Sequence, residues 1–170
     1  MSIDDDVREL RELLEVEDLV PAAALSAFDR FSPQARDALI DEVARQFSPP
    51  PSGHLLARLA QIVTDESRPV LTGTYLANLR SPDPRARRAS LQGLVELGYP
   101  HAVDVALAAL RDDSDIVVGD AVQILLPRAG QDERVRDLLG NVHAAYRDDP
   151  EFYGTTSLLA AHGIEPGEPS

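Results

Sequence analysis

The stretch Asp83–Gly98, DPRARRASLQGLVELG, decides the fold, because a related copy of it begins 32 residues later. The copy is Asp115–Gly130, DIVVGDAVQILLPRAG, and it keeps apolar or small residues at matched places. The matched pairs are Asp83 with Asp115, Ala86 with Val118, Ala89 with Ala121, Leu94 with Leu126, and Gly98 with Gly130. A period of this length indicates a repeated supersecondary unit, so the chain is read first as a repeat protein.

Each unit is predicted to consist of two helices. Asp83 is expected to cap the first helix and Pro84 to occupy its first turn, while Gly98 closes it in the left-handed conformation. Pro100 is expected to open the second helix. Asp115 and Asp149-Pro150 are expected to play the same part as Asp83-Pro84, with the aspartate as the cap of a later helix. The pattern therefore predicts hairpins at 53–80, 83–111 and 115–147 and a final helix at 150–162, with Ser52 as the first cap.

The apolar stripes of these helices require neighbours. Val103, Ala106, Leu107 and Leu110 recur at helical spacing in one second helix, and the same pattern returns 32 residues later from Val135 to Val142. A single hairpin cannot bury such a stripe alone, so neighbouring hairpins are expected to stack. The predicted fold is all-α, a short right-handed α-solenoid of stacked antiparallel helix hairpins, an α-α superhelix.

The stretch Asp83–Gly98 resembles a HEAT-like repeat of the short type that bilin-lyase-like HEAT proteins also contain. The resemblance rests on Asp83-Pro84, Ala86-Arg87, Ala89-Ser90, Leu94 and Gly98. The second copy departs from it, because Gly119 replaces the arginine and Pro127 stands late in the helix, where it can bend the axis. The resemblance implies a scaffold, adaptor or assembly factor, and its bilin-lyase-like branch implies a role in handling a cofactor.

The rest of the chain divides around this repeat domain. Helices are predicted over about 4–16 and about 20–31, and a third opens at Ser32-Pro33. Residues 1–47 can be a diverged hairpin that caps the solenoid or a separate helical element, and both readings stay open. The predicted divisions are an N-terminal helical cap at 1–47, a Pro-rich connector at 48–52, the HEAT-like domain at 53–163 and a disordered tail at 164–170.

Composition narrows the classes of partner. The net charge is −13, and all 16 basic residues are arginine, so the overall field disfavours nucleic acid. This acidic, lysine-free composition fits salt adaptation and a GC-rich coding bias equally well. No apolar stretch approaches the roughly 18 residues of a membrane span. The N-terminus lacks the pattern of a signal peptide, so the cytoplasm is the expected location.

No catalytic or cofactor-binding constellation emerges. The chain has no cysteine, which excludes disulfides and thiol chemistry. Its four histidines have no metal-site spacing, and His101 with Asp104 is read as an exposed polar pair. Arg85, Arg87 and Arg88 form a basic cluster that could bind an anion, although solvation beside neighbouring acids is the stronger reading. We expect no enzyme activity, cofactor or metal.

The expected function is therefore a protein–protein interaction scaffold that uses the concave face of the solenoid. Ala108 and Gly140 are matched small positions where a partner backbone could approach, or they are small only for packing. Homo-oligomerisation stays open, and the alternatives are a cofactor-handling factor and, less favoured, a nucleic-acid binder. The face is predicted to comprise His101, Asp104, Ala108, Arg111, Glu133, Arg136, Gly140, His143 and Arg147.

Overall fold

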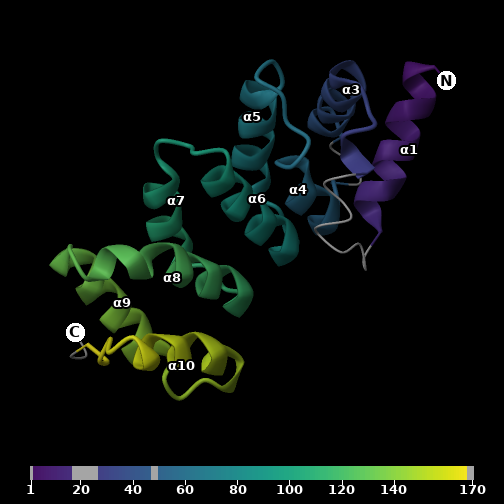
Figure 1. The fold of residues 1–170 in the computed structure, drawn as a ribbon. Coiled ribbons are helices and arrows are strands. Elements are labelled where there is room, and N and C mark those ends of the chain that lie inside the picture. The colour runs from purple at the N-terminus through teal and green to yellow at the C-terminus, as the bar shows by residue number, and fades with distance from the viewer. Residues whose placement is uncertain (1, 17–26, 47–49, 168–170) are drawn as a thin grey trace. The chain divides into compact units, whose positions relative to one another are not determined.

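The computed structural model describes residues 2–16, 27–46 and 50–167, which form helices joined by short turns (Figure 1). Within those ranges there is no strand, which confirms the predicted all-α class. No helix in the same ranges has the length and hydropathy needed to span a membrane. The α-helices are α1 (Ile3–Glu15), α3 (Pro33–Ala44), α4 (Gly53–Leu59), α5 (Arg68–Asn78), α6 (Pro84–Glu96), α7 (Ala102–Ala109), α8 (Asp115–Ala129), α9 (Glu133–Tyr146) and α10 (Tyr153–Ala161), with a short 3-10 helix at Pro150–Phe152.

The helices belong to two compact units. The first unit ends at Tyr99 and the second begins at Pro100. This boundary falls inside the predicted hairpin 83–111, so α6 belongs to the first unit and α7 to the second. The divisions predicted from the sequence, at the connector 48–52 and after Gly163, stay a prediction.

The core of the first unit receives a fully buried leucine from each of the helices α1, α3, α4, α5 and α6. α1 packs on α3 and α4, α4 packs on α6, and α5 packs on α3 and α6. Burial of one such side chain contributes roughly 1.5–3 kcal/mol, so helix packing is the main source of stability here. The five leucines are Leu10, Leu39, Leu55, Leu71 and Leu91.

Tyr75 joins three helices at the centre of the first unit. It projects from α5, is fully buried, and donates a hydrogen bond from its hydroxyl to the Leu56 carbonyl of α4 at 2.9 Å. Its ring lies against Gly93 of α6, where an added Cβ would stand 2.3 Å from the ring carbon Cζ. Burial, reinforced by the charge of Glu96, raises the pKa of the Tyr75 phenol above its usual range. The Tyr75 hydroxyl is therefore neutral, and it contributes to the packing of the core through its hydrogen bond.

The same hydroxyl explains why α4 is shorter than predicted. The sequence pattern suggested a helix over 53–65, but α4 ends at Leu59. In a continuing helix the Leu56 carbonyl would accept from the N–H of Ala60. Here the Leu56 carbonyl accepts from the Tyr75 hydroxyl at 2.9 Å, and the Ala60 N–H bonds the Arg58 carbonyl. A contact 19 residues away in sequence thus ends the helix.

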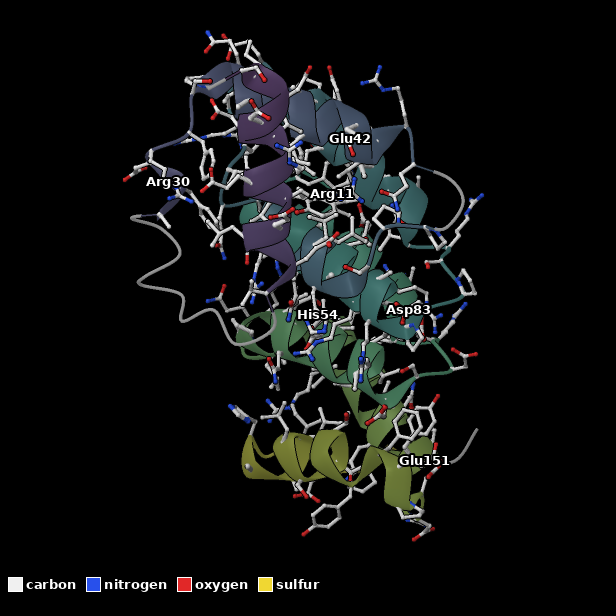
Figure 2. All side chains as sticks on the ribbon, turned by 90° about the vertical axis from the view of Figure 1, so that its right-hand side faces the viewer. Arg11, Arg30, Glu42, His54, Asp83 and Glu151 are labelled. Carbon is white, nitrogen blue, oxygen red and sulfur yellow. The ribbon has the colours of Figure 1, made fainter. Side chains whose placement is uncertain are left out.

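Polar contacts hold α1 against its neighbours. Figure 2 shows Arg11 beside Glu42, and the Nη1 of Arg11 lies 2.5 Å from the Glu42 carboxylate. The Nη2 of Arg11 donates to Gln46 at 2.6 Å. At the end of α1, Arg58 donates to the carbonyls of Leu14, at 2.7 Å, and Val16. The two bonds from Arg58 satisfy carbonyls at the end of α1 that have no partner within the helix.

The predicted helix over 20–31 falls largely outside the described residues, as do Phe47 and the first two residues of the connector 48–52. Its described part contains Phe28 and Phe31, both buried, as the apolar pattern predicted. The helix expected after Ser32-Pro33 is confirmed as α3, and the Ser32 hydroxyl accepts from the Ala35 N–H at 3.2 Å.

The second unit is organised around α8. This helix packs on α7, α9 and α10, and α9 also packs on α10. Val118, Val122 and Leu125 of α8 are fully buried, and so are Leu139 of α9 and Leu159 of α10. Pro127 lies inside α8, which continues to Ala129. The proline therefore stands in the last turn of the helix, where its missing N–H removes one backbone bond, to the carbonyl of the exposed Gln123.

Several predicted helix ends are confirmed. Asp83 caps α6 by accepting from the Arg85 N–H at 2.9 Å. Asp149 accepts from the Glu151 N–H at 3.0 Å. Gly98 has a φ of +67°, the left-handed conformation expected of it.

Other predicted ends are wrong. Asp115 is the first residue of α8 and not its cap, because an Asp112 side chain that accepts from the Ser114 N–H already turns the chain. Gly130 matches Gly98 in sequence but has a φ of −75°. There the Arg128 carbonyl accepts from the N–H groups of residues 131 and 132, which leads directly into α9. The helix predicted to open at Pro100 begins two residues later, at Ala102.

Candidate functional site

The candidate site lies on α9 and is built from one face of that helix. Asp132 caps α9 by accepting from the N–H groups of Arg134 and Val135 at 3.0 and 3.3 Å. The apolar stripe that includes Leu139 points into the unit. Arg136, Gly140 and His143 are spaced four and three residues apart, so they share a second face.

The segment Gly163–Gly167, which follows α10 and is not helical, lies along this face, and we name it the docked segment. It begins where α10 ends in a left-handed turn at Gly163, whose φ is +66°. The Ile164 N–H bonds the Leu159 carbonyl and the Gly163 N–H bonds the Ala160 carbonyl, both at 3.0 Å, which is the Schellman arrangement. Ile164 is only 3% exposed, so its side chain anchors the segment.

Three hydrogen bonds join α9 to backbone atoms of the docked segment. Arg136 Nη2 donates to the Gly163 carbonyl at 3.3 Å, and His143 Nδ1 lies 2.6 Å from the Ile164 carbonyl. A carbonyl can only accept, so Nδ1 of His143 carries the proton. The Gly167 N–H donates to the Gly140 carbonyl at 2.8 Å. Every one of these bonds on the segment side involves the main chain, so none reads a particular side chain.

Two glycines allow the close approach of the segment. A Cβ on Gly140 would stand 3.0 Å from the Glu165 carbonyl oxygen and 3.4 Å from the Gly167 nitrogen. A Cβ on Gly167 would stand 2.7 Å from Asn141 Oδ1 and 3.3 Å from the Asn141 nitrogen. Side chains at either place would separate the two backbones, so the contact favours glycine on both sides.

The docked segment and α9 together line a cavity of about 500 Å³. We name the surface of α9 that the docked segment covers, together with this adjoining cavity, the α9 groove. Its α9 side carries the guanidinium of Arg136, the carboxylate of Asp137 and the amide of Asn141 around Gly140. A positive charge, a negative charge and an amide therefore lie beside the place where the docked segment contacts Gly140. The sequence predicted 164–170 to be a disordered tail, and the described part of it, 164–167, forms the other wall.

The structure gathers three of the nine predicted face residues, Arg136, Gly140 and His143, around one backbone segment. Glu133 and Arg147 are exposed on the same helix, and Arg147 pairs with Asp148 at 3.3 Å. The other four, on or beside α7, are exposed on their own helix, which packs on α8. These four are His101, Asp104, Ala108 and Arg111.

Sequence reasoning missed the residues that meet Gly140. Ile164, Glu165 and Gly167 follow the last predicted helix and have no periodic pattern, so they were assigned to a tail. The available signal was the pair of small residues, Gly140 and Gly167, since two glycines can bring backbones together.

One residue of the predicted anion-binding cluster, Arg87, stabilises a turn. Arg87 Nη1 donates to the Ser81 carbonyl at 3.0 Å and to the Pro82 carbonyl at 3.3 Å, which holds the turn before α6. Arg85 and Arg88 are exposed. The backbone of Arg85 also fits against Gly53 of α4, where an added Cβ would stand 2.8 Å from the Arg85 carbonyl carbon.

The histidines do not gather into a metal site. His101 Nδ1 lies 3.2 Å from the Asp104 carboxylate, and both side chains are well exposed, as the sequence predicted. Across the described ranges, no three His, Cys, Asp or Glu side chains come close enough to hold a metal ion together.

Comparison with known proteins gives no relative from which a function could be carried over. No protein-family model, no curated protein and no solved structure has a significant match to this chain.

Proposed function

We propose that the chain is a non-enzymatic scaffold or adaptor that binds another protein through the exposed surfaces of α7 and α9. One observation carries the proposal. The α9 face holds a non-helical polypeptide segment by its main chain: the Gly167 N–H donates to the Gly140 carbonyl, and the His143 ring donates to the Ile164 carbonyl. A surface that already holds one such segment has the geometry to hold another of similar chemistry.

We further propose that the helices form a HEAT-like solenoid. Packing within each unit supports this arrangement. In the first unit, α1, α4 and α6 would be successive first helices, since α4 packs on both α1 and α6, and α3 packs on α5 as second helices would. In the second unit, α8 packs on α10 in the same way, and α9 packs on α8 and α10. On this interpretation, α7 and α9 are second helices, which line one face of a repeat array.

The charge of the chain favours a protein partner over nucleic acid. The overall charge of −13 repels phosphate, whereas the α9 face combines exposed arginines with Glu133 and Asp137. Mixed charges around a site of backbone contact suit a polypeptide, whose amides and side chains supply both donors and acceptors.

Affinity capture with two matched variants tests this function. The first variant reverses Arg111, Arg136 and Arg147 to glutamate, and the second reverses Arg45, Arg80 and Arg128, which are also exposed but lie outside the predicted face. Both variants change the net charge equally. Proteins captured by the wild type from native lysate should be lost with the first variant and retained with the second, as mass spectrometry would show. If both variants recover the same proteins as the wild type, this face does not bind the partner.

A further inference from the structure

The docked segment occupies the α9 groove in a way that a second polypeptide could reproduce. The three bonds from α9 end on two carbonyls and one N–H of the segment, at Gly163, Ile164 and Gly167. Because these are main-chain groups, a different chain that follows the same backbone path, including the left-handed glycine, would present the same acceptors and donor. Recognition of this kind resembles the addition of a strand to an exposed edge, where main-chain bonds give affinity and side-chain pockets give selectivity.

Two positions of the segment do depend on residue type. Ile164 is 3% exposed, so an apolar side chain is needed there. An added Cβ on Gly167 would stand 3.3 Å from the Asn141 nitrogen and 3.3 Å from the Gly140 carbonyl carbon, so a side chain there would move the segment away from the α9 backbone. The side chain of Glu165 between them is exposed, and Pro166 donates no backbone bond. The groove thus selects an apolar residue followed three positions later by glycine.

From these contacts we propose that the α9 groove is a peptide-binding site for a non-helical partner segment that has this apolar-x-x-Gly pattern and follows the path of Gly163–Gly167. The chain's own Gly163–Gly167 is the resident occupant, and the partner segment must displace it. This inference rests on the proposed function and specifies which surface binds and what it recognises. Because the resident segment is tethered, it competes at a high effective concentration and lowers the apparent affinity for any partner.

Fluorescence anisotropy with a labelled peptide of residues 162–167, HGIEPG, tests the proposal on the full chain. Two variants open the groove by different means. Ile164→Glu replaces the buried apolar anchor with a carboxylate, and Gly167→Val adds a side chain against Asn141. Glu165→Val is the matched control, because the same valine at an exposed position leaves the segment in place. Circular dichroism establishes which opened variant keeps the helical content of the wild type.

The opened variant should bind the peptide about tenfold or more tightly than the wild type or Glu165→Val, since the tethered competitor has been removed. Adding Gly140→Val to the opened variant should abolish binding, and so should replacing the final glycine of the peptide with valine. Equal affinities for the opened variant and the wild type would overturn the proposal and leave Gly163–Gly167 as a structural cap. Dimerisation of the opened variant without peptide binding would also overturn it, in favour of segment exchange between two copies.

These outcomes are separable from those of the capture experiment. If captured proteins depend on the arginines of the face but the peptide does not bind, the scaffold function stands without this groove. If the peptide binds and capture is unaffected by charge reversal, the groove stands and the proposed α7 and α9 face fails.

Discussion

Gly93 in the first unit and Gly140 in the second both let a neighbour approach a helix, but the neighbours differ. Gly93 receives the ring of Tyr75, which is fully buried and fixed by its own hydrogen bond. Gly140 receives the backbone of a non-helical segment beside an open groove. A small residue in a helix can therefore serve core packing or the docking of a polypeptide, and its neighbour decides which.

This contrast predicts that an added methyl group destabilises the protein far more at Gly93 than at Gly140. Gly93→Ala should lower the free energy of unfolding by about 3 kcal/mol, because Tyr75 has no space to withdraw and the core is overpacked. Gly73→Ala in α5, where nothing lies within 4 Å of the added Cβ, is the control and should gain up to about 1 kcal/mol from helix propensity. Urea unfolding measures both. Equal stability of the two variants would show that Tyr75 does not press on Gly93.

Removal of the Tyr75 hydroxyl should have the next largest effect. Tyr75→Phe keeps the ring but leaves the buried carbonyl of Leu56 without its donor, at a cost of about 1–3 kcal/mol. Urea unfolding followed by circular dichroism measures the loss. Tyr153→Phe, at a tyrosine that is 73% exposed, should leave the stability unchanged. A loss of similar size in both variants would contradict the role given to the buried hydroxyl.

Alkaline pH should weaken the first unit through the same group. The pKa of Tyr75 is raised in the folded state, so above the ordinary tyrosine pKa of about 10 the unfolded chain releases a proton that the folded chain retains. Stability from this group is complete below that pH and falls by about 1 kcal/mol for each further pH unit. Unfolding of wild type and Tyr75→Phe between about pH 9 and 11 compares them. The prediction would be contradicted if the difference in unfolding free energy between wild type and Tyr75→Phe did not shrink as pH rises.

In the second unit the predicted effect on stability is the smallest. Gly154→Ala in α10, with open space around the added Cβ, should gain up to about 1 kcal/mol from helix propensity. Gly140→Ala has the same propensity gain, but its methyl group meets the Glu165 carbonyl, so the net gain should be smaller. Denaturation midpoints of the two variants make the comparison. A gain at Gly140 as large as that at Gly154 would show that the docked segment does not press on α9.

Local signals account for the parts of this fold that sequence predicted. Caps such as Ser52 and Asp83 and the left-handed Gly98 are set by groups within a few residues, so the sequence pattern places them correctly. The early end of α4 is different, because it depends on Tyr75 from another helix. The division between α6 and α7 also depends on contacts that periodicity cannot report.

The candidate site was predicted only in part for the same reason. Helical spacing identified Arg136, Gly140 and His143 as one outward face, and small size identified Gly140 as a place for close approach. The occupant was not predictable from pattern, because a non-helical segment bonded through its main chain needs no hydrophobic period. Only the three-dimensional path of the chain after α10 brings Gly167 to Gly140.

Amide hydrogen exchange at Gly167, followed by NMR in the full-length wild type and in Gly140→Ala, tests most directly whether the α9 face holds a non-helical segment. The hydrogen bond from the Gly167 N–H to the Gly140 carbonyl predicts exchange well below the rate of an unstructured glycine in the wild type. The methyl group of Gly140→Ala should raise that rate, while amides in the buried middle of α8 stay protected. Exchange of Gly167 at the unstructured rate in the wild type would contradict the account, because α9 would then hold no segment.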